Sequence, residues 1–203
     1  MEVITTLYFK HPSAEVQQQL VKLFSEEQTE TTLPKACQQI NPTTGAAAAK
    51  RFFENCGEDS LPAHEGIEKR AGFVTVDWTQ GSNADNFMHE LVTLLYALAP
   101  EITAKAYGSG DDDPWEFWIL RHNGEVHMFD NGALEDEEYD AETVGTIYRL
   151  WHQDLPKSIR IGYLIDEDTG DFIAVDDELQ ISDEQYQAWC DSLGSENHGS
   201  FVF

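Results

Sequence analysis

The spacing of apolar residues predicts a strand followed by a helix at the start of the chain. Residues 2–9 are rich in β-branched and aromatic side chains, which is typical of a β-strand. Apolar residues from Val16 to Phe24 then recur at helical spacing, and Ser13 stands where a helix N-cap is expected. Residues 29–61 contain prolines and a run of alanines without either period, so they predict loops around one short helix.

A second strand and a strongly patterned helix follow. In residues 71–78 apolar and polar side chains alternate toward the end of the segment, and the composition is that of a β-strand. After the turn residues 81–83, one apolar stripe runs from Phe87 to Leu98, as in an amphipathic helix. Because proline cannot continue a helix, Pro100 sets the latest point at which this helix can end.

Residues 115–130 predict a β-hairpin. Asn123-Gly124 is the residue pair that suits a two-residue type I′ turn. In the register that this turn sets, Trp118 lies opposite Phe129, and both faces of the hairpin are apolar in the middle. We therefore expect this hairpin to be central in the sheet and covered on both faces.

The remainder of the chain predicts one more hairpin between two helices. Asp140 is placed to cap the first helix, residues 159–165 and 172–175 form the hairpin, and Ser182 caps the second helix. Because the two hairpins interrupt any strict alternation of strands and helices, we predict an α+β fold. Its sheet is mixed or antiparallel, with amphipathic helices packed on it.

The length of 203 residues and the 41% hydrophobic content fit one domain with a continuous core. We predict a single α+β domain over residues 1–194 and a C-terminal tail over residues 195–203. Within the domain, residues 29–70 are expected to be loop-rich or inserted.

Cysteine usage and the absence of long apolar runs predict a cytoplasmic protein. The three cysteines are widely spaced and form no CxxC pair, so they indicate neither a disulfide framework nor a thiolate zinc site. The first residues have no basic run ahead of an apolar stretch, and no apolar run approaches the ~20 residues of a membrane span. We expect no membrane association.

The charge is the most unusual property of the chain. It has 38 acidic and 12 basic residues, a formal net charge of −26. Residues 1–110 contribute −6 and residues 111–203 contribute −20. Such a field repels nucleic acid and anionic membranes, so no direct nucleic-acid binding is expected. It attracts a cationic partner, although an acidic surface also serves solubility alone.

Three acidic tracts with neighbouring aromatic residues are the candidate binding surface. Each is predicted at the end of a strand or in a turn, where loops from one sheet can converge, although charge runs can also be separate solvated loops. Aromatic anchors beside charged groups are typical of protein interfaces. The predicted partner-binding residues are Asp111, Asp112, Asp113, Trp115, Glu116, Glu135, Asp136, Glu137, Glu138, Tyr139, Asp166, Glu167 and Asp168.

Recognisable catalytic motifs are absent from the sequence, which contains no GxSxG, GxGxxG, P-loop or HExxH. His122 and His127 share a face of the predicted hairpin, so a surface metal site is geometrically possible, but no further ligand stands at diagnostic spacing. Cys56 and His64 lack a third residue to orient them as a thiol–imidazole pair. We therefore expect no catalytic residues, no cofactor and no metal.

In size and charge the chain is similar to bacterial immunity proteins, which are acidic α+β proteins that bind and neutralise a cationic toxin domain, often a nuclease. The resemblance covers the whole chain in these general properties and identifies no functional positions. It implies a basic partner whose cationic cleft the acidic face would occlude. Two alternatives stay open: a nucleic-acid mimic of the anti-restriction type that binds a DNA-binding host protein, and an uncharacterised acidic enzyme.

Overall fold

The chain divides into two compact units, Met1–Met128 and Phe129–Phe203. The computed structural model describes residues 2–70, 72–110, 115–130, 150–151, 163–165 and 172–174. Most of the described residues belong to the first unit. The single domain expected over residues 1–194 stays a prediction, since two compact units can belong to one domain.

An antiparallel sheet organises the first unit. Its strand order is β4-β5-β1-β6-β7-β8. Strand β1 pairs antiparallel with β5 and β6, β4 pairs with β5, and β6 pairs with β7 in the same way. The strands are β1 (Val3–Lys10), β4 (Gly66–Arg70), β5 (Phe73–Gln80), β6 (Thr103–Gly110), β7 (Glu116–His122) and β8 (Glu125–Asp130).

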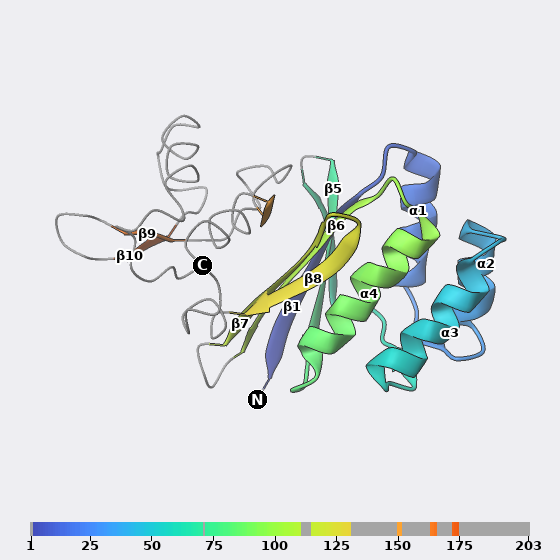
Figure 1. The fold of residues 1–203 in the computed structure, drawn as a ribbon, viewed down its shortest axis with the longest axis horizontal. Coiled ribbons are helices and arrows are strands. Elements are labelled where there is room, and N and C mark those ends of the chain that lie inside the picture. The colour runs from blue at the N-terminus through green and yellow to red at the C-terminus, as the bar shows by residue number, and fades with distance from the viewer. Residues whose placement is uncertain are drawn as a thin grey trace. The chain divides into compact units, whose positions relative to one another are not determined.

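Four helices lie on one side of this sheet (Figure 1). They are α1 (Ala14–Leu23), α2 (Leu33–Ile40), α3 (Gly45–Cys56) and α4 (Ala84–Leu98). Helix α4 packs on β1, β6 and β7, α3 packs on α4, and α2 packs on α3. A short ladder between β2 (Gln28–Thr29) and β3 (Ser60–Leu61) joins the segments that flank α2 and α3. The predicted α+β class, with an antiparallel sheet and packed helices, is confirmed.

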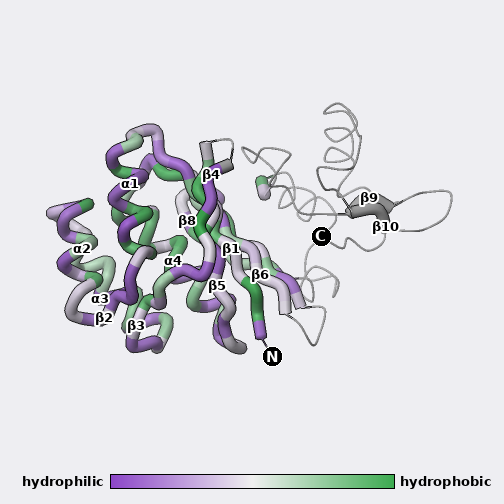
Figure 2. The backbone as a smooth tube through the Cα atoms, turned by 180° about the vertical axis from the view of Figure 1, so that it is seen from behind, coloured by the Kyte–Doolittle hydropathy of each residue, from purple (hydrophilic) through white to green (hydrophobic). Residues whose placement is uncertain are grey.

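The core lies between the sheet and the helices. Register pairs Leu7 with Val76 and with Ala106, and Ala106 with Ile119, so these four buried side chains form a row across four strands. Each helix in Figure 2 carries both hydrophilic and hydrophobic stretches, as expected when one face meets the core. The core therefore depends both on the alternation of buried and exposed side chains along the strands and on the helical spacing of apolar side chains in the helices.

The patterns at the start of the chain and before Pro100 predicted their elements correctly. Strand β1 and helix α1 occupy the expected places, and the Ser13 hydroxyl accepts a hydrogen bond from the Val16 amide at 3.4 Å. Helix α4 begins directly after the predicted turn and buries most of its length. None of the helices in the described residues is long and apolar enough to cross a membrane.

Residues 29–70 were expected to be loop-rich or inserted; the loop-rich alternative is wrong, and whether the segment is inserted stays a prediction. This segment contains α2, α3 and β4, and α2 packs closely against α3. At Gly45 a Cβ atom would lie 2.1 Å from the carbonyl oxygen of Cys37, so only glycine permits this approach. The alanines after Gly45 favour a helix, and Pro34 lies in the first turn of α2, where proline is tolerated.

Strand β6 was not predicted, because its core-facing residues are small. Ala104, Ala106 and Gly108 lie on the side that faces the helices, and such residues give no β-propensity signal. Gly108 lies opposite Phe117 of β7, and a Cβ at Gly108 would lie 2.2 Å from that ring. The small residues of β6 therefore make room for larger neighbours.

The hairpin of β7 and β8 is confirmed, but its central position is wrong. Asn123 has φ 51° and Gly124 has φ 90°, the left-handed values that a type I′ turn requires. Trp118 and Ile119 lie on opposite faces of β7 and are both buried, as expected for a strand covered on both sides. However, β8 is the last strand in the order and β1 lies nearer the middle. The pairing of Trp118 with Phe129 stays a prediction.

The described part of the second unit contains the other predicted hairpin. Strands β9 (Tyr163–Ile165) and β10 (Phe172–Ala174) pair antiparallel, with Phe172 opposite Ile165. Of the helix expected after Asp140, only residues 150–151 are described, and they are helical. The helix expected after Ser182 and the tail of residues 195–203 lie outside the described residues.

Replacing Gly108 with alanine tests the contact between β6 and β7. Because the new Cβ would overlap the buried Phe117 ring, Gly108→Ala is expected to lower the free energy of unfolding by about 1 to 3 kcal/mol. Gly81→Ala is the matched control, since a Cβ there has no atom within 4 Å. Urea unfolding of both variants measures the difference, and equal midpoints would show that the sheet absorbs the added methyl group.

Candidate functional site

Only two of the predicted partner-binding residues fall within the described part of the chain. These are Trp115 and Glu116, at the start of β7. The others lie outside the described residues: Asp111, Asp112, Asp113, Glu135, Asp136, Glu137, Glu138, Tyr139, Asp166, Glu167 and Asp168. Whether the three acidic tracts form one face therefore stays a prediction.

Both described residues are tied to the sheet. The Tyr107 hydroxyl donates a hydrogen bond to Oε1 of Glu116 at 2.5 Å. Burial, followed by the charge of Glu116, raises the pKa of Tyr107 well above its ordinary value, so this phenol stays protonated as the donor. Trp115 is half-buried, and its ring centroid lies 5.1 Å from that of Phe117. Part of each side chain is thus used for local packing, and the remainder can meet a partner.

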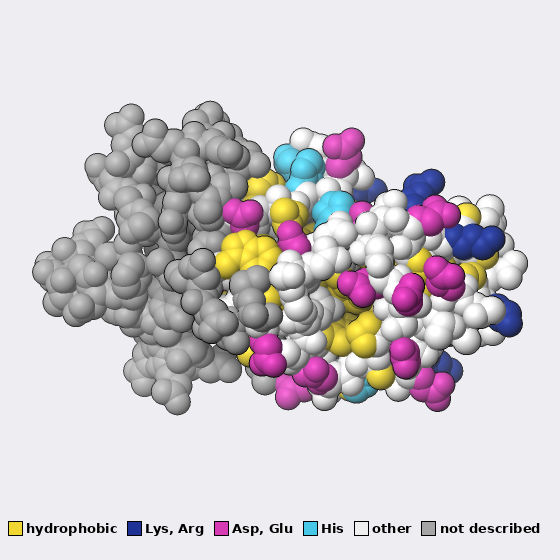
Figure 3. Space-filling view, turned by 90° about the horizontal axis from the view of Figure 1, so that it is seen from below, with side chains coloured by type: hydrophobic (Ala, Val, Ile, Leu, Met, Phe, Trp, Pro, Cys, Tyr) yellow, Lys and Arg dark blue, Asp and Glu magenta, His cyan; other side chains and the backbone are white. Residues whose placement is uncertain are grey.

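Carboxylates dominate the described surface. Of the 17 acidic residues described, 12 are exposed and only Glu90 is buried. In the view of Figure 3, acidic side chains are spread over the described surface, whereas lysine and arginine gather toward the helices. The exposed basic residues of the helices are Lys22, Lys35, Lys50 and Arg51. Most acidic side chains among the described residues are therefore exposed to solvent.

A cavity of about 410 Å³ lies where β5 ends and α4 begins. Its volume is within the range of small-ligand sites. The wall comes from the loop after α3, from β3 and from the turn between β5 and α4. The lining residues are Glu58, Ser60, Pro62, Gln80, Gly81, Ser82, Asn83, Ala84 and Phe87.

Hydrogen bonds of Asn83 hold the two sides of this cavity together. Its side-chain amide donates to the carbonyl oxygen of Cys56 at 3.0 Å and to Oε1 of Glu58 at 3.4 Å. Asn83 is the N-cap residue of α4, yet its side chain makes no capping hydrogen bond. Because that side chain is used to reach the end of α3, it fixes the carboxylate of Glu58 at the cavity.

The cavity wall is negatively charged. Glu58 lines it, whereas none of the lining residues is lysine or arginine. Asp59 and Asp85 are direct neighbours of lining residues in the chain. The N-terminus of α4 adds a positive end worth roughly half an elementary charge, which is less than these carboxylates supply. The cavity thus favours a cationic or hydrogen-bond-donating group.

Sequence reasoning did not find this cavity. The turn of residues 81–83 before a strong helix was recognised, but its meeting with Glu58 depends on how α3 packs on α4. Gln80 also contributes an amide oxygen that is buried and has no donor among the described residues. The wall therefore retains hydrogen-bonding capacity that no sequence motif signals.

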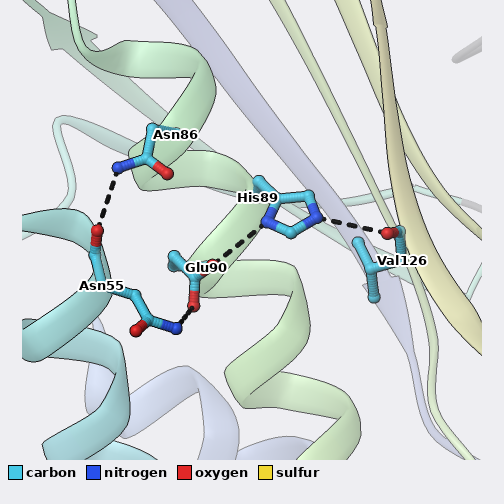
Figure 4. Close-up of polar contacts among 5 residues, drawn as sticks. All are labelled: Asn55, Asn86, His89, Glu90 and Val126. Carbon is cyan, nitrogen blue, oxygen red and sulfur yellow. Dashed lines mark hydrogen bonds and ion pairs between the residues drawn. The ribbon is translucent and has the colours of Figure 1, made fainter.

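A second polar cluster links α3, α4 and β8 (Figure 4). Glu90 of α4 accepts a hydrogen bond from the Asn55 side chain at 2.9 Å, and its other oxygen lies 3.2 Å from Nδ1 of His89. Nε2 of His89 lies 3.2 Å from the carbonyl oxygen of Val126. Asn86 donates to the carbonyl oxygen of Asn55 at 3.2 Å. These contacts satisfy a carboxylate that is buried at the helix interface.

The His89–Glu90 pair resembles the orienting half of a catalytic triad, but its geometry is structural. In such a triad one imidazole nitrogen faces the orienting carboxylate and the other faces the nucleophile. Here the second nitrogen of His89 is used by the backbone carbonyl of Val126. The pair therefore connects α4 to the sheet and has no nitrogen to offer a substrate.

The described cysteines are unsuited to nucleophilic chemistry. Cys37 and Cys56 are free and buried. Burial raises the pKa of the Cys37 thiol to about 12 and also raises that of Cys56, so neither forms the reactive thiolate readily. Sγ of Cys56 lies 4.0 Å from the carbonyl oxygen of Phe53, a contact within its own helix. The Cys56–His64 pair considered from the sequence thus has no activated thiol.

The histidines at the hairpin turn lie close together. The rings of His122 and His127 have centroids 6.4 Å apart, and Nε2 of His127 lies 3.3 Å from the carbonyl oxygen of His122. The Asn123 amide lies 2.9 Å from Nε2 of His122. Across the described ranges, no group of three or more potential metal ligands is present. Within the residues described, the pair has hydrogen-bond partners but no third ligand.

Comparison with known proteins gives no relative: no family model, curated protein or solved structure matches the chain.

Replacing His89 with alanine tests its structural role. His89→Ala removes the contact with Val126 and leaves Glu90 with fewer partners, so the free energy of unfolding should fall by about 1 kcal/mol. Amide hydrogen exchange in β8 should accelerate with it. His11→Ala serves as control, because His11 contacts only the nearby Ser13 through its ring. A stability loss that is the same for both variants would contradict the proposed link.

The buried thiol of Cys37 predicts a pH dependence of stability. Its pKa rises from 9.0 to about 12 on folding, so in this window the folded chain keeps a proton that the unfolded chain releases. The free energy of unfolding should therefore fall as pH rises from about 9 toward 12, by up to about 1.4 kcal/mol per pH unit. Cys37→Ala should fall less steeply than the wild type in urea unfolding at each pH, and identical slopes would exclude this contribution.

Proposed function

We propose that this chain is an acidic inhibitor that binds a basic protein domain and covers its cationic cleft. The partner is a bacterial toxin domain of the nuclease type, so the chain acts as the corresponding immunity protein. The observation that carries the proposal is the net charge of −26, of which residues 111–203 supply −20. A nuclease grips phosphates with basic groups, and a carboxylate surface complements them.

Charge of this density acts first on the rate of association. Complementary fields steer two proteins together and raise the association rate constant by a factor of about 10 to 1,000, an effect that salt reduces. Exposed pairs are screened beyond about 8 Å at physiological ionic strength. Aromatic anchors such as Trp115 would supply a part of the binding energy that salt does not remove.

The described surface supports a binding function. Exposed carboxylates such as Glu26, Glu27 and Glu125 are carried on an antiparallel sheet and packed helices, or on the short segments between them. Such a scaffold holds charges in place before the partner arrives, which lowers the ordering cost of association. His89 is engaged with Glu90 and Val126, and the thiols of Cys37 and Cys56 are buried, so these groups contribute to packing.

The function is tested with the proteins encoded beside this chain. Each neighbouring reading frame is expressed alone and together with this chain, and the prediction is that one product is toxic through a basic domain and is neutralised on co-expression. In a titration of that purified domain, its activity should end at about one equivalent of this chain. If the toxin activity instead ends far below one equivalent, and the toxin domain stays inactive after this chain is removed, then this chain modifies its target as an enzyme does.

A charge-matched pair of variants locates the binding surface in the same system. Replacing Asp111, Asp112 and Asp113 with asparagine should lower the association rate constant by about tenfold at low salt. Replacing the exposed Glu26, Glu27 and Glu30 with glutamine removes the same charge from the segment around β2 and should change it little. Equal effects would indicate a diffuse field, and capture of a DNA-binding host protein instead of a toxin would favour the nucleic-acid mimic.

A further inference from the structure

We infer that the cavity between the end of β5 and the start of α4 receives an arginine side chain of the partner protein. The inference rests on the proposed function, since it names one contact by which a basic partner would be held. It places one contact among the described residues of the first unit, whereas Asp111, Asp112 and Asp113 and the two later acidic tracts lie outside the described residues.

The lining of the cavity matches the two parts of an arginine side chain. Pro62, Ala84 and Phe87 provide apolar wall for the methylene stem, which long basic side chains bury while their charged end stays polar. Glu58, Ser60 and Ser82 provide the oxygen acceptors for the guanidinium group.

The balance of charge selects a cation over an anion. A helix N-terminus alone would favour an anion, but its positive end is worth roughly half a charge. Glu58 is a full charge in the wall, and Asp85 lies in the first turn of α4 itself. With no lysine or arginine among the lining residues, Glu58 supplies the one full charge of the wall.

The number and spread of acceptors favours arginine over lysine. A guanidinium has five N–H donors in a fixed plane, whereas an ammonium is a compact point charge. The acceptors here come from the loop after α3, from β3 and from the turn before α4, so three separate segments contribute them. Glu58 accepts a hydrogen bond from the Asn83 side chain at 3.4 Å, a contact that favours its place at the cavity.

The experiment titrates the full-length protein with acetyl-arginine-amide and follows backbone amide signals by NMR. Acetyl-citrulline-amide is the matched control, because it has the same shape without the charge. We expect chemical-shift changes centred on residues 58–62 and 80–87 with the arginine compound. The citrulline compound should bind at least about fivefold more weakly.

Three variants decide between the cavity and the general field of the protein. Glu58→Gln should weaken binding of the arginine compound by about fivefold, while Glu30→Gln, which removes an equal and exposed charge elsewhere, should leave it unchanged. Ser82→Lys places a cation in the exposed turn and should abolish the shifts. The NMR spectrum also reports whether each variant is folded.

The outcomes separate this inference from the proposed function. Equal weakening by Glu58→Gln and Glu30→Gln, or shifts spread over all acidic residues, would overturn the cavity as a site. Neutralisation of a toxin by the Glu58→Gln variant at the wild-type rate and affinity would likewise remove the cavity, yet leave the inhibitor function intact. Loss of the function itself would appear only in the assay of the neighbouring gene products.

Discussion

The close approach of α4 to β6 is the constraint on which the described fold depends. The core-facing side chains of this strand are small, so that α4 can approach closely and pack on β6, β1 and β7 together. These residues are Ala104, Ala106 and Gly108. Phe117 fills the space above Gly108, opposite which it lies in β7. Because α3 packs on α4 and α2 on α3, the positions of these two helices follow from this contact.

The period of hydrophobic residues was sufficient to predict the elements that pack through large side chains. It failed to predict the elements that pack through small residues. Strand β1, helix α4 and the β7–β8 turn each carry a strong local signal, and each was predicted. Strand β6 carries no such local signal, because its core-facing residues are small and leave space for larger neighbouring side chains. The segment of α2 and α3 was expected to form loops around one short helix, since the contact of Gly45 with Cys37 that joins the two helices is tertiary and leaves no pattern in the sequence.

Likewise, only one part of the candidate binding surface could be predicted from the sequence. The excess of acidic groups could be predicted from composition, because charged side chains remain at the surface almost regardless of fold. The cavity beside Glu58 could not, because its walls come from three segments that only the packing of α3 on α4 brings together. What composition predicts is the sign of a partner's charge, whereas the place of contact depends on tertiary structure.

The contact of His89 with Val126 has a consequence for how the protein behaves among its own copies. Strand β8 ends the sheet in the described part of the chain, and the edge of a sheet is a template on which a foreign strand can add. His89 reaches from α4 and engages one backbone carbonyl of this strand. A foreign strand would have to displace the imidazole before it could pair at this carbonyl. The side chain that stabilises the fold therefore also opposes aggregation by strand addition at this edge of the sheet.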